Sequence, residues 1–99
     1  WVMDGAATVY GFAVWWEAQL APGVLISTAP GAARTHWEQL YFPLAAALTA
    51  AAGETVQISL RSRSSPEGGT HLAWTATLAD DAGKVKVRYA HDLDKGYLP

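Results

Sequence analysis

Cysteine is absent from this 99-residue sequence, and charged residues make up only 16% of it. The lack of thiols excludes a disulfide framework, a thiolate nucleophile and a cysteine-based zinc site. It also fits a reducing compartment, so we predict an intracellular, cytoplasmic location. Low charge is unusual in a chain this short, which buries only about 60–65% of its unfolded surface. We therefore expect part of its surface to be covered by a neighbour.

Basic residues are scarce as well, with seven Lys and Arg and a net charge of −2. This composition lacks the electrostatic footprint of nucleic-acid binding, and no polybasic run suggests a membrane surface. The longest nearly apolar run, Phe42 to Ala52, is far shorter than the ~20 residues of a spanning helix. We predict no nucleic-acid partner and no membrane contact. The start at Trp1, without a signal-peptide pattern, predicts a fragment of a longer protein.

Alternating apolar and polar residues are the main pattern that is present. Residues Thr8 to Leu20 alternate with period two and predict one strand. Similar runs separated by Gly, Pro or Asp turn signals predict further strands. These runs are Val24 to Ser27, Trp37 to Leu44, Val56 to Leu60, Leu72 to Leu78 and Val85 to Tyr89. The sequence therefore predicts an all-β fold over residues 1–99, a small antiparallel barrel or sandwich of about six to eight short strands.

Three stretches give less regular signals. The alanines of Ala45 to Ala52 favour a helix when taken alone, but the stretch is short and Gly53 ends it, so strand and helix both stay open. Residues Arg61 to Thr70 are polar and rich in Gly and Ser, which predicts a flexible hairpin loop. The tail from His91 onward is polar and is predicted to be irregular.

Two short motifs between residues 25 and 39 are the most specific feature. The sequence reads Leu-Ile-Ser-Thr-Ala-Pro over residues 25–30 and, four residues later, Thr-His-Trp-Glu-Gln over residues 35–39. This pattern resembles the C-terminal β-barrel domain of the protein arginine N-methyltransferases, in which a Leu-Ser-Thr-x-Pro loop leads to a Thr-His-Trp-x-Gln motif. The flanking strands extend the resemblance from about Tyr10 to Leu60.

The resemblance implies a barrel that completes the substrate side of an active site. In that family a Rossmann-like domain binds S-adenosylmethionine, and a methyl group passes to an arginine guanidinium. No glycine-rich cofactor loop occurs here, so we expect the cofactor domain to lie outside this chain and the chain alone to be inactive. The implied partners are the cofactor-binding domain of the same polypeptide, an arginine-containing protein substrate, and a second copy joined through an arm absent here.

Three neighbouring residues take site roles by this resemblance. His36 is implied as a supporting catalytic residue that pairs with an acidic group of the cofactor domain and bridges the two domains. Trp37 is implied to line the arginine pocket with its flat ring. Thr35 is implied on the substrate side, where its hydroxyl would hold the loop by a backbone hydrogen bond. No cofactor-binding residue and no metal ligand is predicted in this chain.

Structural alternatives exist for each of these roles. His36 also suits a strand-end cap, and Trp37 also suits a core position. Ser27 and Thr28 beside a histidine could suggest a nucleophile, but no acid is placed to orient that histidine, so we interpret them as loop-shaping.

Other polar and aromatic residues have simpler interpretations. Trp15 and Trp16 are predicted on opposite faces of one strand, one in the core and the other toward the missing domain. Arg61 and Arg63 share a strand face and could bind an anion, although a solvated strand end explains them too. A metal ion could be coordinated by His91, Asp92 and Asp94. A solvated tail is the alternative interpretation of these residues.

Two other functions remain open at this stage. A small Trp-rich β-sandwich could bind carbohydrate or protein without a catalytic role, stacking sugars on exposed indoles. A degenerate barrel kept only for protein interaction is the third hypothesis.

Overall fold

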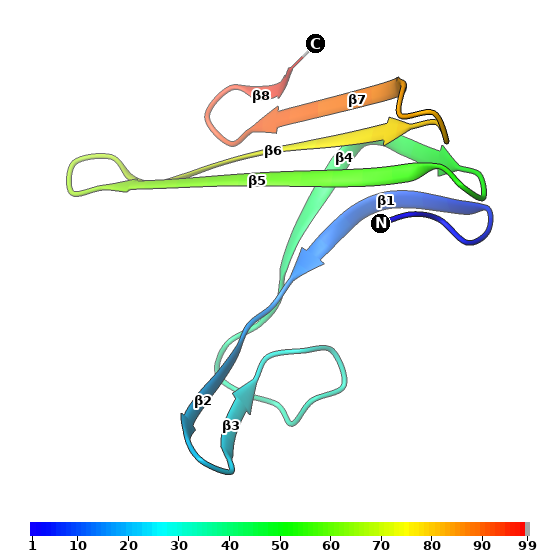
Figure 1. Ribbon diagram of the computed structural model, residues 1–99. Helices are drawn as coiled ribbons and strands as arrows, with labels where there is room; N and C mark the ends of the chain where they lie inside the picture. Colours follow the sequence, from blue (N-terminus) through cyan, green and yellow to red (C-terminus); the bar gives the residue numbers. More distant parts are fainter. Residues whose placement is uncertain (99) are drawn as a thin grey trace. The chain divides into compact units, whose positions relative to one another are not determined.

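Residues 1–98 are described by a computed structural model, and over this range the chain folds into β-strands joined by turns and loops (Figure 1). The all-β prediction is confirmed. Among the described residues, no helix is long and apolar enough to span a membrane. The strands are β1 (Ala7–Val14), β2 (Glu17–Ala21), β3 (Val24–Ser27), β4 (Leu40–Ala50), β5 (Thr55–Ser65), β6 (Gly69–Ala79), β7 (Val85–Asp92) and β8 (Gly96–Leu98).

The chain forms two compact units. The first, which we call the core unit, consists of residues 1–10 together with those from Pro43 onward. The second, the hairpin unit, spans Gly11–Phe42. Strands β1 and β4, which form a two-stranded sheet, each contribute residues to both units.

A four-stranded antiparallel sheet in the order β5-β6-β7-β8 dominates the core unit. One face of it carries the apolar residues that the period-two pattern predicted, with Val56 opposite Leu78 and Ile58 opposite Ala76. Burying a leucine fully contributes about 1.5–3 kcal/mol, so this cluster accounts for much of the unit's stability. The buried cluster consists of Leu44, Leu48, Ala50, Val56, Ala76 and Leu78, with Met3, Val9, Ile58, Val87 and Tyr89 packed against it.

The alanine-rich stretch is resolved in favour of a strand, because β4 continues to Ala50. Apart from Ala46, which is exposed, its side chains alternate: those at 44, 48 and 50 are buried and those at 45, 47 and 49 are exposed. This two-residue alternation matches a sheet with one covered face. Burial of alternate residues therefore overrides the helix propensity of alanine.

Two predicted strand boundaries are wrong near the N-terminal half. The run Thr8 to Leu20 forms two strands, because β1 ends at Val14 and β2 begins at Glu17. The predicted strand Trp37 to Leu44 begins only at Leu40. In both places the extended pattern continues through residues that pair with no neighbouring strand.

The hairpin predicted at Arg61 to Thr70 is present, but its loop is much shorter than predicted, and the prediction of an irregular tail is wrong. β5 and β6 remain paired out to Ser65 opposite Gly69, so only residues 66–68 turn, and the hairpin extends beyond β7 (Figure 1). The tail continues β7 to Asp92 and adds β8. Backbone hydrogen bonds between neighbouring strands hold these polar stretches together. Their side chains therefore do not show the apolar alternation by which a strand is predicted from sequence.

Candidate functional site

The loop that carries the Thr-His-Trp motif is tied at both of its ends. At its start, Thr28 is 3% exposed, and its Oγ1 accepts a bond from the Trp16 backbone N–H at 3.0 Å. The same hydroxyl donates to the Trp16 carbonyl at 3.2 Å. At the far end, the Gln39 side-chain amide donates to the Thr28 carbonyl. Thr28 is thus loop-shaping, as predicted, and the segment between residues 28 and 39 is closed by its own side chains.

Thr35 fixes the backbone beneath the indole of the motif. Its hydroxyl donates to the Trp37 carbonyl at 2.8 Å and accepts from the Trp37 N–H at 3.2 Å. Such local side-chain bonds stabilise a bend in place of regular pairing. The hydroxyl-to-backbone role predicted for Thr35 is therefore observed.

His36 and Trp37 lie on the surface of the hairpin unit. His36 is exposed and Trp37 is 54% exposed. The two rings meet edge to face with centroids 6.0 Å apart, and Trp37 also packs against Trp16 at 5.4 Å with 66° between the planes. The structure thus brings Thr35, His36 and Trp37 together on one accessible loop. The core position considered for Trp37 is excluded.

The prediction that Trp15 and Trp16 share one strand, with one of them in the core, is wrong. Trp15 is 46% and Trp16 is 40% exposed, so neither occupies the core. The cause is the break between β1 and β2, because both residues stand outside the strands. Trp16 serves instead as a backbone anchor for Thr28 and a ring partner for Trp37.

The hairpin unit exposes an unusual amount of apolar surface. Of residues 11–42, only Thr28 and Phe42 are buried, and Phe42 stacks on Phe12 with centroids 5.0 Å apart. Exposed apolar side chains in this number make the hairpin unit a candidate interaction surface. The large exposed side chains are Val14, Trp15, Trp16, Leu20, Val24, Leu25, Trp37, Leu40 and Tyr41.

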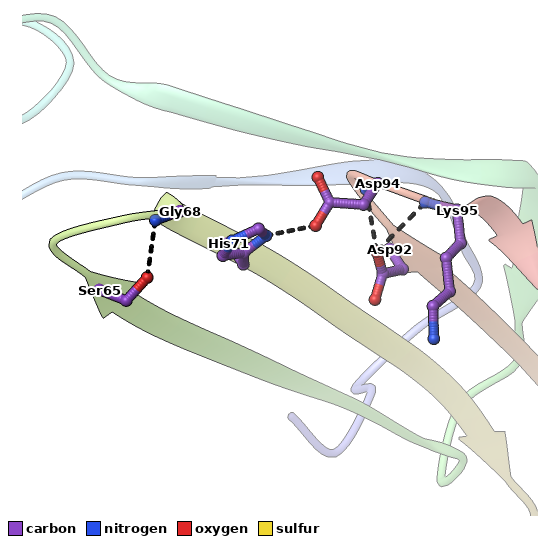
Figure 2. Close-up of polar contacts among 6 residues, drawn as sticks. All are labelled: Ser65, Gly68, His71, Asp92, Asp94 and Lys95. Atoms are coloured by element: carbon purple, nitrogen blue, oxygen red, sulfur yellow. Dashed lines mark hydrogen bonds and ion pairs between the residues drawn. The ribbon is translucent and has the colours of Figure 1, made fainter.

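A second polar cluster lies in the core unit, at the turn between β7 and β8. Figure 2 shows Asp94 directed toward His71, whose Nδ1 it pairs with, and Asp92 directed toward the backbone of the turn. Asp92 Oδ1 accepts from the N–H groups of Asp94 at 2.9 Å and of Lys95 at 3.2 Å. Sequence reasoning missed this cluster because residues 71 and 94 are far apart in sequence and no short motif joins them.

The metal site considered around His91 is not formed. Across the part of the chain that the structure describes, no three His, Asp or Glu side chains are placed to hold a metal ion. His91 stacks on Trp74 with centroids 4.3 Å apart and meets Tyr97 edge-on at 4.2 Å. His91 is therefore an aromatic packing residue, whereas the Asp94 side chain is 58% exposed, as the solvated-tail interpretation expected.

Glu54 is a further acidic residue that the sequence did not single out. Its side chain is 10% exposed and pairs with Lys86, and its Oε1 accepts from the Ala51 N–H at 2.7 Å. The hydrogen bond from Lys86, followed by the Ala51 bond, lowers the pKa of the Glu54 carboxyl from its ordinary value. This carboxylate fastens the turn between β4 and β5, and its role is structural.

Comparison with known proteins assigns the family. The sequence family described as the arginine methyltransferase oligomerization subdomain matches residues 2–77. No curated protein matches the chain, and no solved structure does. The match covers most of the chain and contains both motifs of the exposed loop, as well as the strands that flank them. The chain therefore belongs to the arginine methyltransferase oligomerization subdomain family, as the resemblance of residues 25–39 predicted.

Proposed function

We propose that this chain forms the substrate side of the active site of an S-adenosylmethionine-dependent protein arginine N-methyltransferase. The observation that carries the proposal is the loop of residues 28–39, which is closed by its own hydrogen bonds and leaves His36 and Trp37 exposed. A fixed loop with outward rings can position a substrate without first having to be ordered.

The three motif residues have separate tasks in this proposal. The indole of Trp37 offers a flat surface against which a guanidinium can lie by cation–π attraction. His36 pairs with an acidic group of the cofactor domain and thereby positions the loop against the reacting centre. Thr35 keeps the Trp37 backbone in place through its two hydrogen bonds. Holding the guanidinium in one orientation removes much of the entropic barrier to transfer.

S-adenosylmethionine, bound by another domain, supplies an electrophilic sulfonium methyl group. The described residues of this loop suit the guanidinium side of the reaction, since they present aromatic rings. The exposed apolar side chains of the hairpin unit provide the surface on which that cofactor domain, in the same polypeptide, can dock. The family's oligomerization role is compatible with a second copy using part of the same surface.

The test uses the complete polypeptide that carries this chain. His36→Ala and Trp37→Ala should each lower methyl transfer to an arginine-rich peptide about tenfold or more, equivalent to about 1.4 kcal/mol in the barrier. Binding of S-adenosylmethionine should stay within about twofold of the parent. Trp1→Ala, which removes a more exposed indole of the core unit, is the matched control. Unchanged transfer in both motif variants would refute the proposal.

Carbohydrate binding is a second candidate because Trp16 and Trp37 are exposed neighbours. Sugars stack best on rings that form a common plane, whereas these two planes meet at 66°. The geometry therefore favours the methyltransferase proposal. Titration with a soluble polysaccharide separates the two, since a saturable shift of tryptophan emission, abolished in Trp37→Ala, would support sugar binding.

A further inference from the structure

The face of the main sheet that turns away from the core carries an arginine-lined groove. In the register of the sheet, Arg61 lies opposite Ala73 and Arg63 opposite His71, while Arg88 of β7 lies opposite Thr77. Residues directly opposite each other project from the same face, so all three guanidiniums share the open face. They line a depression of about 580 Å³ whose floor includes the half-buried Ala73 and Thr75.

The β7–β8 turn closes one end of this groove. Asp94 reaches from the turn to pair with His71 on β6 (Figure 2). Asp92 accepts two backbone N–H groups of the same turn. These contacts hold the turn at the end of the depression, where Lys95 also lines it. The groove is thus shaped by bonds within the chain.

The charges of the groove are unbalanced in favour of cations. Arg61, Arg63, Arg88 and Lys95 supply four positive charges and the two aspartates two negative ones, which leaves +2 on a chain whose net charge is −2. Both aspartates are occupied by the contacts above. Within residues 1–98 the ion pairs are His71–Asp94 and Lys86–Glu54, so no carboxylate pairs with any of the three arginines.

The spacing of the arginines indicates the shape of the ligand. Arg61 and Arg63 are two residues apart on one strand, a separation of about 6.7 Å that equals the repeat of alternate side chains in an extended peptide. The backbone of Arg88 lies two strands from that of Arg61. The offset is about 9.6 Å across the sheet and about 13 Å along the strands. A single phosphate held by Arg61 and Arg63 would leave Arg88 unused, whereas a chain with several carboxylates can occupy all three.

We propose that this groove binds an extended acidic segment of a partner protein, with alternate carboxylates on Arg61 and Arg63 and a further one on Arg88. Guanidinium and carboxylate form paired, charge-assisted hydrogen bonds, which gives such a site both affinity and register. The inference goes beyond the proposed function and does not depend on it, because a positively charged face repels an arginine-rich methyl acceptor.

The test measures binding of a fluorescent ten-residue peptide of alternating Glu and Thr to the complete polypeptide at about 50 mM salt, by anisotropy. The double variant Arg61→Gln/Arg63→Gln should weaken binding at least tenfold, and Arg88→Gln alone at least threefold. Arg34→Gln, which removes an exposed arginine of the hairpin unit, should leave binding unchanged. Circular dichroism checks the fold, and Arg61→Lys/Arg63→Lys, which keeps the charge, should weaken binding less than the Gln pair.

Three results would overturn the proposal. They are no binding of the peptide to the parent protein, equal binding by the parent and the Arg61→Gln/Arg63→Gln variant, and full competition by millimolar inorganic phosphate or by a DNA oligonucleotide at the peptide's own concentration. Methyl transfer should be unaffected by these variants, so a failure here is distinguishable from a failure of the methyltransferase proposal.

Discussion

The two units of this chain are organised in opposite ways. The core unit packs leucine, valine and alanine side chains against one face of a four-stranded sheet. The hairpin unit buries Thr28 and Phe42 and leaves most of its large apolar side chains exposed. The pairing of β2 with β3 and the hydrogen bonds between Thr28, Trp16 and Gln39 hold it together. The core unit is stabilised by its own apolar core, whereas the hairpin unit leaves its apolar side chains available to a partner.

This difference explains where the motif residues lie. His36 and Trp37 stay accessible while hydrogen bonds define the path of the backbone, which is the arrangement that the proposed docking of a cofactor domain requires. The four experiments below test whether the two units respond to substitution as differently as their packing implies.

The largest effect is expected from Leu48→Ala in the core unit, where the side chain is 1% exposed. Removing buried methyl groups and leaving a cavity should lower the free energy of unfolding by about 2–5 kcal/mol. Leu25→Ala in the hairpin unit, 60% exposed, should change it by no more than about 0.5 kcal/mol. Urea denaturation measures both, and equal losses would contradict the proposed contrast between the units.

Gly11→Ala tests a close backbone approach in the hairpin unit. A Cβ at this position would lie 2.4 Å from Tyr41 Oη and 2.6 Å from the Phe42 carbonyl oxygen. The tyrosine can move but the carbonyl is backbone, so we expect a loss of about 1–3 kcal/mol. Gly5→Ala, which meets nothing within 4 Å, is the control, and a loss of similar size there would show that the crowding is unimportant.

Thr28→Val tests the hydrogen bonds that close the loop. The variant keeps the shape of the side chain but leaves the Trp16 backbone groups without the hydroxyl, which should cost about 1–3 kcal/mol. Thr49→Val on the exposed side of β4 should stay within about 0.5 kcal/mol. Thermal unfolding compares the two, and equal midpoints would remove the basis for a closed loop.

The lowered pKa of Glu54 predicts that the free energy of unfolding of the core unit depends on pH. Because the pKa of this carboxyl is lower in the folded state, its contribution is present above the unfolded value, near 4.5, and is lost as the pH falls through the folded value. Glu54→Gln should therefore narrow the difference in stability between pH 7 and pH 3. A series of urea titrations measures it, and parallel pH profiles for parent and variant would disprove the linkage.

Sequence reasoning worked best where the two-residue alternation of apolar side chains matches the side chains that the sheet buries. Alternation at Val85, Val87 and Tyr89 predicted β7, and the glycine turns at Gly23, Gly53 and Gly83 adopt positive φ angles that glycine tolerates. It failed for the polar hairpin arms of β5 and β6, whose pairing depends on backbone bonds and not on apolar side chains.

The position of the candidate loop was predictable, but the contacts that support the loop were not. The Thr-His-Trp motif identified the loop, whereas the contact between Thr28 and Trp16 joins residues 12 apart and depends on the break between β1 and β2. The arginine groove needed the strand register to be known, since Arg88 is far from Arg61 in sequence.

Hydroxyl-radical footprinting of the complete polypeptide tests the central claim most directly. Trp37, 54% exposed, and Tyr97 of the core unit, 49% exposed, start from similar accessibility. If the loop faces the arginine pocket, adding an arginine-rich peptide with the demethylated cofactor product should slow oxidation of Trp37 severalfold and leave Tyr97 unchanged. Unaltered oxidation of Trp37 under saturating peptide would contradict the account.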